Sequence, residues 1–139
     1  STVVERSKLE LPIVIDHKAY LFTTNNFDEA NYICAFLNSQ YANLTIKEFQ
    51  SRGLFGVRDI HKVILDVGLK KFNSTNEIHA QISNISKECH LKVRNYIEHE
   101  DLPSVLPTHL LGKQRLKVRE ILSSEINSID QLLQQIEGE

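Results

Sequence analysis

The sequence contains no methionine and no tryptophan, and it has only two cysteines, three prolines and five glycines. Without a methionine the chain has no start residue of its own, so either an initiator methionine is missing from its start or the chain is a domain excised from a longer protein, and we expect the excised domain. Two cysteines are too few for a disulfide framework. Because Cys34 and Cys89 fall at apolar positions of expected helices, we expect both to be buried free thiols.

Neither sign of charge dominates, because 16 lysines and arginines are matched by 18 aspartates and glutamates, which leaves a formal charge of -2. This balance excludes a general attraction of the whole chain to phosphate, so any nucleic-acid role must depend on a local basic patch. No run approaches the ~18 apolar residues that span a membrane, and no signal peptide is recognisable. We therefore expect a cytoplasmic protein without membrane contact. The chain has 139 residues, 41% of them hydrophobic and 24% charged, which is typical of one folded domain.

Residues 1–74 predict a small α+β body built on a mixed sheet. Two β-branched and aromatic runs, at 13–15 and 19–24, are separated by polar residues and predict a hairpin. A third run of this kind, "VILDVGL" at 63–69, predicts a further strand.

Helices are expected to pack on this sheet. Asn26 stands three residues before Glu29, which is the spacing of an N-cap and its capping-box partner. The helical periodicity that follows predicts a helix over about 27–41 that packs on the hairpin. Residues 42–49 fit a helix or a strand equally well, because their apolar spacing does not decide between the two.

Residues 75–139 predict a long antiparallel helical hairpin that packs on the body as one structural unit. Ser74 and Glu77 have capping-box spacing and predict the start of a helix over about 75–98. A second helix, over about 108–136, has apolar residues every third or fourth position, close to a heptad seam. The residues of this seam are Val118, Leu122, Ile126, Ile129, Leu133 and Ile136.

The sequence contains no enzyme signature. It lacks a Gly-x-Gly-x-x-Gly turn, a phosphate loop and a Gly-x-Ser-x-Gly elbow, so we expect no catalysis by this chain. Its six histidines are scattered, and adjacent residues such as Cys89 and His90 point in directions about 100° apart on a helix. We therefore expect no metal site.

The segment 49–62, "FQSRGLFGVRDIHK", is the best candidate for a binding site. Its two glycines allow close approach to a partner, and its arginines suit phosphate or guanine edges. The alternative is a glycine-hinged surface loop whose Leu54 and Phe55 cover the core. The candidate DNA-binding residues are Gln50, Arg52, Gly53, Gly56, Arg58, His61, Lys62, Lys70 and Lys71.

The order of motifs over about 18–95 resembles the region downstream of the catalytic domain in N6-adenine DNA methyltransferases of restriction-modification systems. The motifs are an aromatic strand, an acidic residue with Ala and Tyr, "LNS", a Gly-Leu-Phe-Gly loop with Arg and Ile-His-Lys, an Ile-Leu-x-Val strand and an Asn-x-x-His helix. They correspond here to Tyr20, Glu29 to Tyr32, Leu37 to Ser39, Gly53 to Gly56, Arg58, Ile60 to Lys62, Ile64 to Val67, and Asn76 to His79. The chain is also similar to the target-recognition domains of type I specificity subunits.

This resemblance implies a non-catalytic part that contacts double-stranded DNA and docks on the catalytic domain or subunit of its parent. The methyltransferase motif Asn-Pro-Pro-Tyr and the cofactor-binding glycine motif are absent. S-adenosylmethionine and methyl transfer are therefore expected in the catalytic domain of the parent, with no cofactor in this chain.

A protein-interaction module is the alternative, and the near-neutral charge favours it. In that case the helical hairpin docks another domain or subunit, or forms a homodimer through the last helix, and DNA is irrelevant to this part of the protein.

Overall fold

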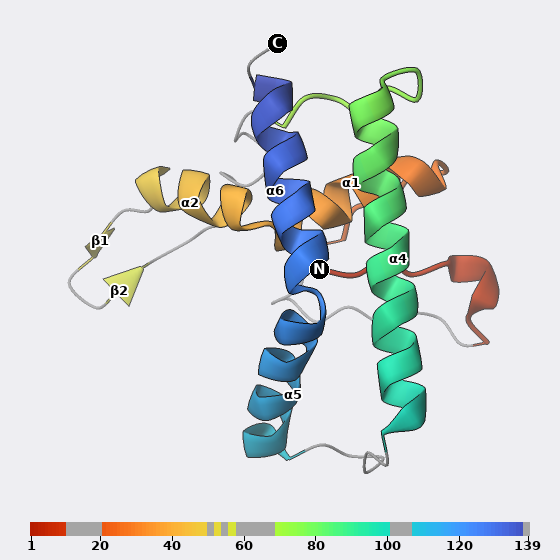
Figure 1. The fold of residues 1–139 in the computed structure, drawn as a ribbon, viewed down its shortest axis with the longest axis vertical. Helices are drawn as coiled ribbons and strands as arrows, with labels where there is room; N and C mark the ends of the chain where they lie inside the picture. The colour runs from red at the N-terminus through yellow and green to blue at the C-terminus, as the bar shows by residue number, and fades with distance from the viewer. Residues whose placement is uncertain (11–20, 50–51, 54–55, 58–68, 101–106, 138–139) are drawn as a thin grey trace.

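The computed structural model describes residues 1–10, 21–49, 52–53, 56–57, 69–100 and 107–137. Figure 1 shows a bundle in which α1 and α6 pack on α4, α2 packs on α1 and α6, and a short two-stranded ribbon stands to one side. In chain order the elements are the 3-10 helix η1 (Arg6–Lys8), α1 (Phe27–Asn38), α2 (Gln40–Phe49), β1 (Arg52–Gly53), β2 (Gly56–Val57), α4 (Glu77–His99), α5 (Thr108–Ile121) and α6 (Ser123–Glu137).

The fold is helical, so the prediction of an α+β body with a mixed sheet is wrong. The strands among the described residues are β1 and β2 alone, each two residues long. Residues 21–24 of the predicted hairpin are not in a strand. Leu21 and Phe22 are exposed. Because their side chains do not pack on the face of a sheet, their β propensity alone does not produce a strand. The rest of that hairpin, and residues 63–68 of the other predicted strand, lie outside the described residues.

The helix predicted over 27–41 is interrupted at Ser39, which has an extended backbone and separates α1 from α2. The Ser39 hydroxyl donates to the Phe36 carbonyl at 2.6 Å and accepts from the Ala42 N–H at 3.0 Å, so it caps both helices. The Asp130 carboxylate of α6 accepts from the Tyr41 N–H at 2.9 Å and holds the start of α2. These caps explain why residues 42–49, whose periodicity was undecided, form a helix.

Two N-cap predictions have different outcomes. The Asn26 side chain accepts from the N–H groups of Asp28 and Glu29, so the N-cap is confirmed. The predicted capping box is wrong, because the Glu29 carboxylate accepts from the Thr24 hydroxyl at 2.5 Å and the Asn26 N–H donates to that hydroxyl at 3.0 Å. At α4, however, the N-cap is Asn76 rather than Ser74, and its side chain accepts from the N–H groups at positions 78 and 79. Ser74 lies instead in the preceding turn.

The helix predicted over 108–136 is divided at Leu122 into α5 and α6. The Leu122 N–H still donates to the Val118 carbonyl, so the two helices follow each other with only a local change of direction. Two serines follow Leu122, and serine pairs are common at such bends. Figure 1 shows α5 and α6 returning antiparallel to α4.

The core lies where α1, α2, α4 and α6 meet. Tyr32 and Phe36 of α1 and Ile82 of α4 are fully buried, and Ala42 of α2 lies beside them. The C-terminal half of the predicted seam, Ile129, Leu133 and Ile136, is buried in this same core. The last helix thus buries its apolar residues within its own chain. Among the described residues no helix has the length and apolarity needed to cross a membrane.

Candidate functional site

The segment predicted to be a binding loop contains the β1–β2 ribbon. Arg52 pairs with Val57 and Gly53 with Gly56 in antiparallel register, which leaves two residues, Leu54 and Phe55, between the strands. Connections of two residues demand unusual backbone angles, which neighbouring glycines make easier to reach. Figure 1 shows the ribbon beyond the end of α2 and on the far side of that helix from α4.

The structure brings only part of the predicted site together. Arg52, Gly53 and Gly56 lie on the ribbon. Lys70 and Lys71 are exposed, but they follow Leu69 along the surface of α1. Since the ten residues of α2 extend for about 15 Å, the lysines and the ribbon are separate positions on the molecule. The other predicted contacts, Gln50, Arg58, His61 and Lys62, lie outside the described residues.

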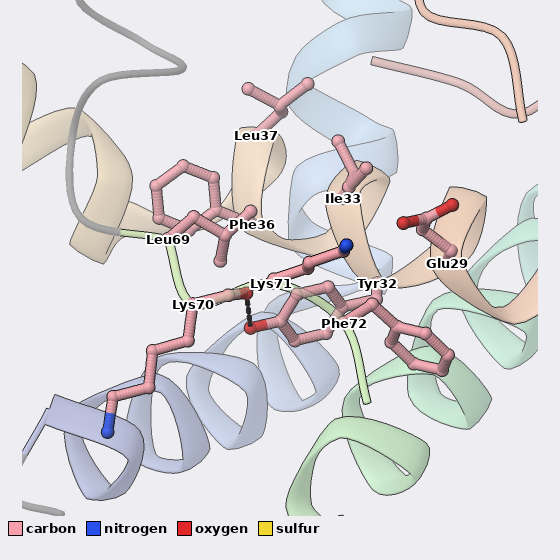
Figure 2. A pocket seen from close by; sticks show the side chains of 9 residues that line it. All are labelled: Glu29, Tyr32, Ile33, Phe36, Leu37, Leu69, Lys70, Lys71 and Phe72. Atoms are coloured by element: carbon pink, nitrogen blue, oxygen red, sulfur yellow. Dashed lines mark hydrogen bonds between the residues drawn. The ribbon is translucent and has the colours of Figure 1, made fainter. Parts of the chain in front are cut away.

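Lys70 and Lys71 border a small pocket of about 160 Å³ between α1 and the segment 69–72 (Figure 2). The Tyr32 hydroxyl donates to the Lys70 carbonyl at 3.1 Å and fixes this segment against α1. In Figure 2 the two lysine side chains extend to different sides of the segment. They do not converge on one ligand position, which suits separate contacts with a polyanion better than a cage around one small anion.

An aromatic group holds the segment 69–72 in place. The ring centroids of Tyr32 and His79 are 4.7 Å apart, and those of Tyr32 and Phe72 are 5.5 Å apart. The buried His79 Nδ1 accepts from the Asn73 N–H at 3.0 Å. Burial raises the pKa of the Tyr32 hydroxyl to about 12, so it remains a neutral donor at physiological pH. The group therefore supports the fold by holding the segment 69–72 against α1.

A second cavity, of about 800 Å³, runs between α4 and the α5–α6 arm, and we call it the α4–α5 groove. Across this groove, the Tyr96 hydroxyl of α4 donates a hydrogen bond of 2.5 Å to the side-chain oxygen of Gln114 on α5. Cys34 and Ala35 of α1 also line the groove. The side chains of α4 and α5 that supply its apolar lining include Val93, Tyr96, Ile97, Leu111, Leu116 and Val118.

His90 connects the N-terminal segment to this groove. Its Nδ1 lies 2.8 Å from the Ser86 carbonyl, which only accepts, so Nδ1 carries the proton. Its Nε2 is then free to accept from the Val3 N–H at 3.3 Å. The Asn38 side chain donates to the Ser1 carbonyl at 3.0 Å. Polar groups of α1 and α4 thus bind the first three residues of the chain, two of which line the groove.

The two thiols of the groove are unreactive by environment. Burial raises the pKa of the Cys34 thiol, and burial also raises that of Cys89 to about 11. A thiol attacks only as its thiolate, so neither side chain is an activated nucleophile at neutral pH. Both cysteines are free, and among the described residues no group of three or more histidine, cysteine, aspartate or glutamate side chains could hold a metal ion.

Ion pairs fasten α4 to the helices on either side of it. Lys87 contacts the Asp28 carboxylate of α1 at 2.5 Å, and its ammonium lies 5.8 Å from the centroid of the Phe27 ring. Lys92 pairs with Glu125 of α6, and this hydrogen bond lowers the pKa of the Glu125 carboxyl and raises that of the Lys92 ammonium. These lysines are therefore engaged within the chain, whereas Arg115 and Arg119 have no ion-pair partner among the described residues.

Sequence reasoning missed the groove because it treated 108–136 as one apolar seam. The signal was available in the face formed by positions 112, 115, 116 and 119, whose spacing of three and four places them together on a helix. That face contains a glycine, a leucine and two arginines, which is not the composition of a packed seam.

Comparison with protein-family models, with curated proteins and with solved structures found no match to this chain. The choice among functions therefore depends on the geometry above and on the motif order of the sequence.

Proposed function

We propose that this chain is a non-catalytic, DNA-contacting C-terminal part of a cytoplasmic restriction-modification adenine methyltransferase. The observation that carries the proposal is the antiparallel β1–β2 ribbon, which bears Arg52 and stands clear of the helical bundle (Figure 1). A two-stranded antiparallel ribbon has dimensions that fit the DNA major groove. The helical bundle then acts as the support from which the ribbon reaches a duplex.

Each candidate residue has a role in this proposal. Arg52, Arg58, His61 and Lys62 contact DNA, and the Gln50 amide suits the two hydrogen-bonding positions of an adenine edge. Lys70 and Lys71, which are exposed and away from the ribbon, contact phosphates and so hold register without reading sequence. S-adenosylmethionine and methyl transfer belong to the catalytic domain of the parent protein.

The test is fluorescence anisotropy of the chain with a random-sequence duplex of about 20 base pairs between about 50 and 200 mM salt. We expect Arg52→Ala/Arg58→Ala to weaken binding and to reduce the slope of log K against log salt by about 2, one for each lost phosphate contact. The matched control is Arg94→Ala/Lys113→Ala, which removes the same charge from exposed positions on α4 and α5. An equal loss in the control, or no binding at the lowest salt, would contradict the proposal.

A second candidate function is docking of another domain or subunit of the parent protein on α4 and α5. The observation that favours it is the exposure of large apolar side chains on these two helices, which a solvated helix does not need. Leu91 and Ile97 of α4 are 56% and 52% exposed, and Leu116 of α5 is 69% exposed. Deletion of residues 108–139 is a poor test of docking, because it would also remove the core residues of α6. Substitution of Leu116 by serine leaves the core intact and tests the surface alone.

A further inference from the structure

We propose that the α4–α5 groove binds an amphipathic α-helix of another polypeptide, with carboxylates flanking its apolar face. This inference gives the docking candidate above a location and a class of partner, and it rests on that candidate. Three independent features of the groove carry it: its charge, its apolar rim and a glycine inside α5.

The charge of the groove differs from that of the chain. The whole chain has a formal charge of -2, yet the described side chains that line the groove include Arg115 and Arg119, and none of those described is an aspartate or glutamate. Neither arginine is paired with a described carboxylate. Two arginines one helical turn apart beside an apolar cavity suit a ligand with apolar side chains between two or more carboxylates.

The apolar rim indicates a helix rather than an extended strand. The groove lies between helices that the Tyr96–Gln114 hydrogen bond connects, and no sheet edge borders it among the described residues. A helix enters such a groove with anchors at positions i, i+3 or i+4, and i+7. Leu116 and Ile97, on the two walls, remain more than half exposed without such a partner. A nucleic acid can bind the two arginines without contact to an apolar surface. It would therefore leave Leu116 and Ile97 exposed.

Gly112 is not required for packing against any described part of its own chain. It lies inside α5, where glycine is the poorest helix former apart from proline. A Cβ placed on it would meet nothing within 4 Å, so no neighbouring atom requires its small size. Yet Gly112 lines the groove, on the same helical face as Arg115, Leu116 and Arg119. An absent side chain at this point allows the backbone of a partner helix to approach α5 closely.

The test uses three synthetic amphipathic peptides of about four helical turns that share one leucine face and differ only in their flanking residues, which are glutamate, glutamine or lysine. Binding to the full chain is measured by fluorescence anisotropy at low salt. We expect the glutamate peptide to bind about tenfold more tightly than the glutamine peptide and the lysine peptide to bind most weakly, with the differences shrinking as salt is raised.

The decisive variant is Gly112→Leu, which fills the space above α5 while favouring the helix. We expect it to bind the glutamate peptide at least tenfold more weakly, with a melting temperature no lower than that of the unmodified chain. The matched control is Gln131→Leu, which adds the same side chain at an exposed position of α6 outside the groove, and it should leave peptide binding unchanged.

The outcomes distinguish failure of the docking function from failure of the acidic-helix inference. If none of the peptides binds, both the docking function and this inference fail. If peptides bind and Leu116→Ser weakens them, but their order ignores charge or Gly112→Leu has no effect, docking stands and the acidic-helix inference is overturned. If Arg115→Gln/Arg119→Gln reduces binding of a DNA duplex and leaves peptide binding intact, the arginines serve nucleic acid and the inference is overturned as well.

Discussion

Tyr32→Phe tests the account of how α1 holds the segment 69–72. The substitution removes only the hydroxyl that donates to the Lys70 carbonyl at 3.1 Å and leaves the ring against Phe72 and His79. At neutral pH the loss of this hydrogen bond should lower the free energy of unfolding by about 1 kcal/mol. The segment that carries Lys70 should also become less protected from hydrogen exchange.

The same hydroxyl makes the effect depend on pH. Burial raises the pKa of Tyr32 from 10.0 to about 12, so the folded state resists its ionisation. Its contribution is fully present below pH 10 and is lost as the pH rises through 12. At about pH 11 the unmodified chain should have lost about 1.4 kcal/mol of stability through this one group, whereas the phenylalanine variant has no group here to ionise. The two proteins should therefore be equally stable near this pH, and the variant should be the more stable above it.

Urea unfolding followed by circular dichroism from about pH 7 to about pH 11.5 measures this crossing. The difference in tyrosinate absorbance between the two proteins gives the titration of Tyr32 itself, because the chain contains no tryptophan and only four tyrosines. A stability difference that stays constant with pH, or one that grows in favour of Tyr32 in the alkaline range, would refute the reasoning.

Three further predictions concern α4. Asn76→Ala should cost about 1 kcal/mol in urea unfolding because it removes the N-cap, whereas Ser74→Ala should cost almost nothing. Ile82→Ala should cost about 2 to 5 kcal/mol because the side chain is fully buried, and the exposed control Leu91→Ala should cost less than about 0.5 kcal/mol. Cys89 should react slowly with a disulfide reagent near neutral pH, since burial raises its pKa to about 11, and rapid labelling of the folded chain would contradict that environment.

Local signals in the sequence predicted much of the helical structure. Asn26 caps α1 as its spacing indicated, and the periodicity after it matches the buried face of that helix. A helix cap is formed by side chains within three or four residues of the helix end. A cap can therefore be predicted from the sequence without knowledge of the fold. At α4 the same reasoning chose Ser74, because several capping residues stand in a row and only the turn at 73–76 decides among them.

The failures have a common physical origin in contacts between residues far apart in sequence. Ser39 breaks the first helix where Asp130, from the other end of the chain, receives the start of α2. Residues 21–24 were predicted to be in a strand from their β propensity, which does not indicate which side chains become buried in the fold. In the candidate DNA site, Arg52 is close to Gly53 and Gly56 in the sequence, and all three lie in the β1–β2 ribbon. The length of α2 separates Lys70 from the ribbon, and the pattern of residues in the sequence did not predict this separation.

The most direct test of the proposed function is photo-crosslinking of the chain to a DNA duplex from a benzoylphenylalanine placed at Val57 on the ribbon. The same probe at Leu91, exposed on α4, is the matched control. The account predicts a crosslinked protein–DNA band from position 57 and none from position 91, with the band lost at high salt. A band from position 91, or DNA binding without any crosslink from position 57, would contradict the assignment of DNA contact to the β1–β2 ribbon.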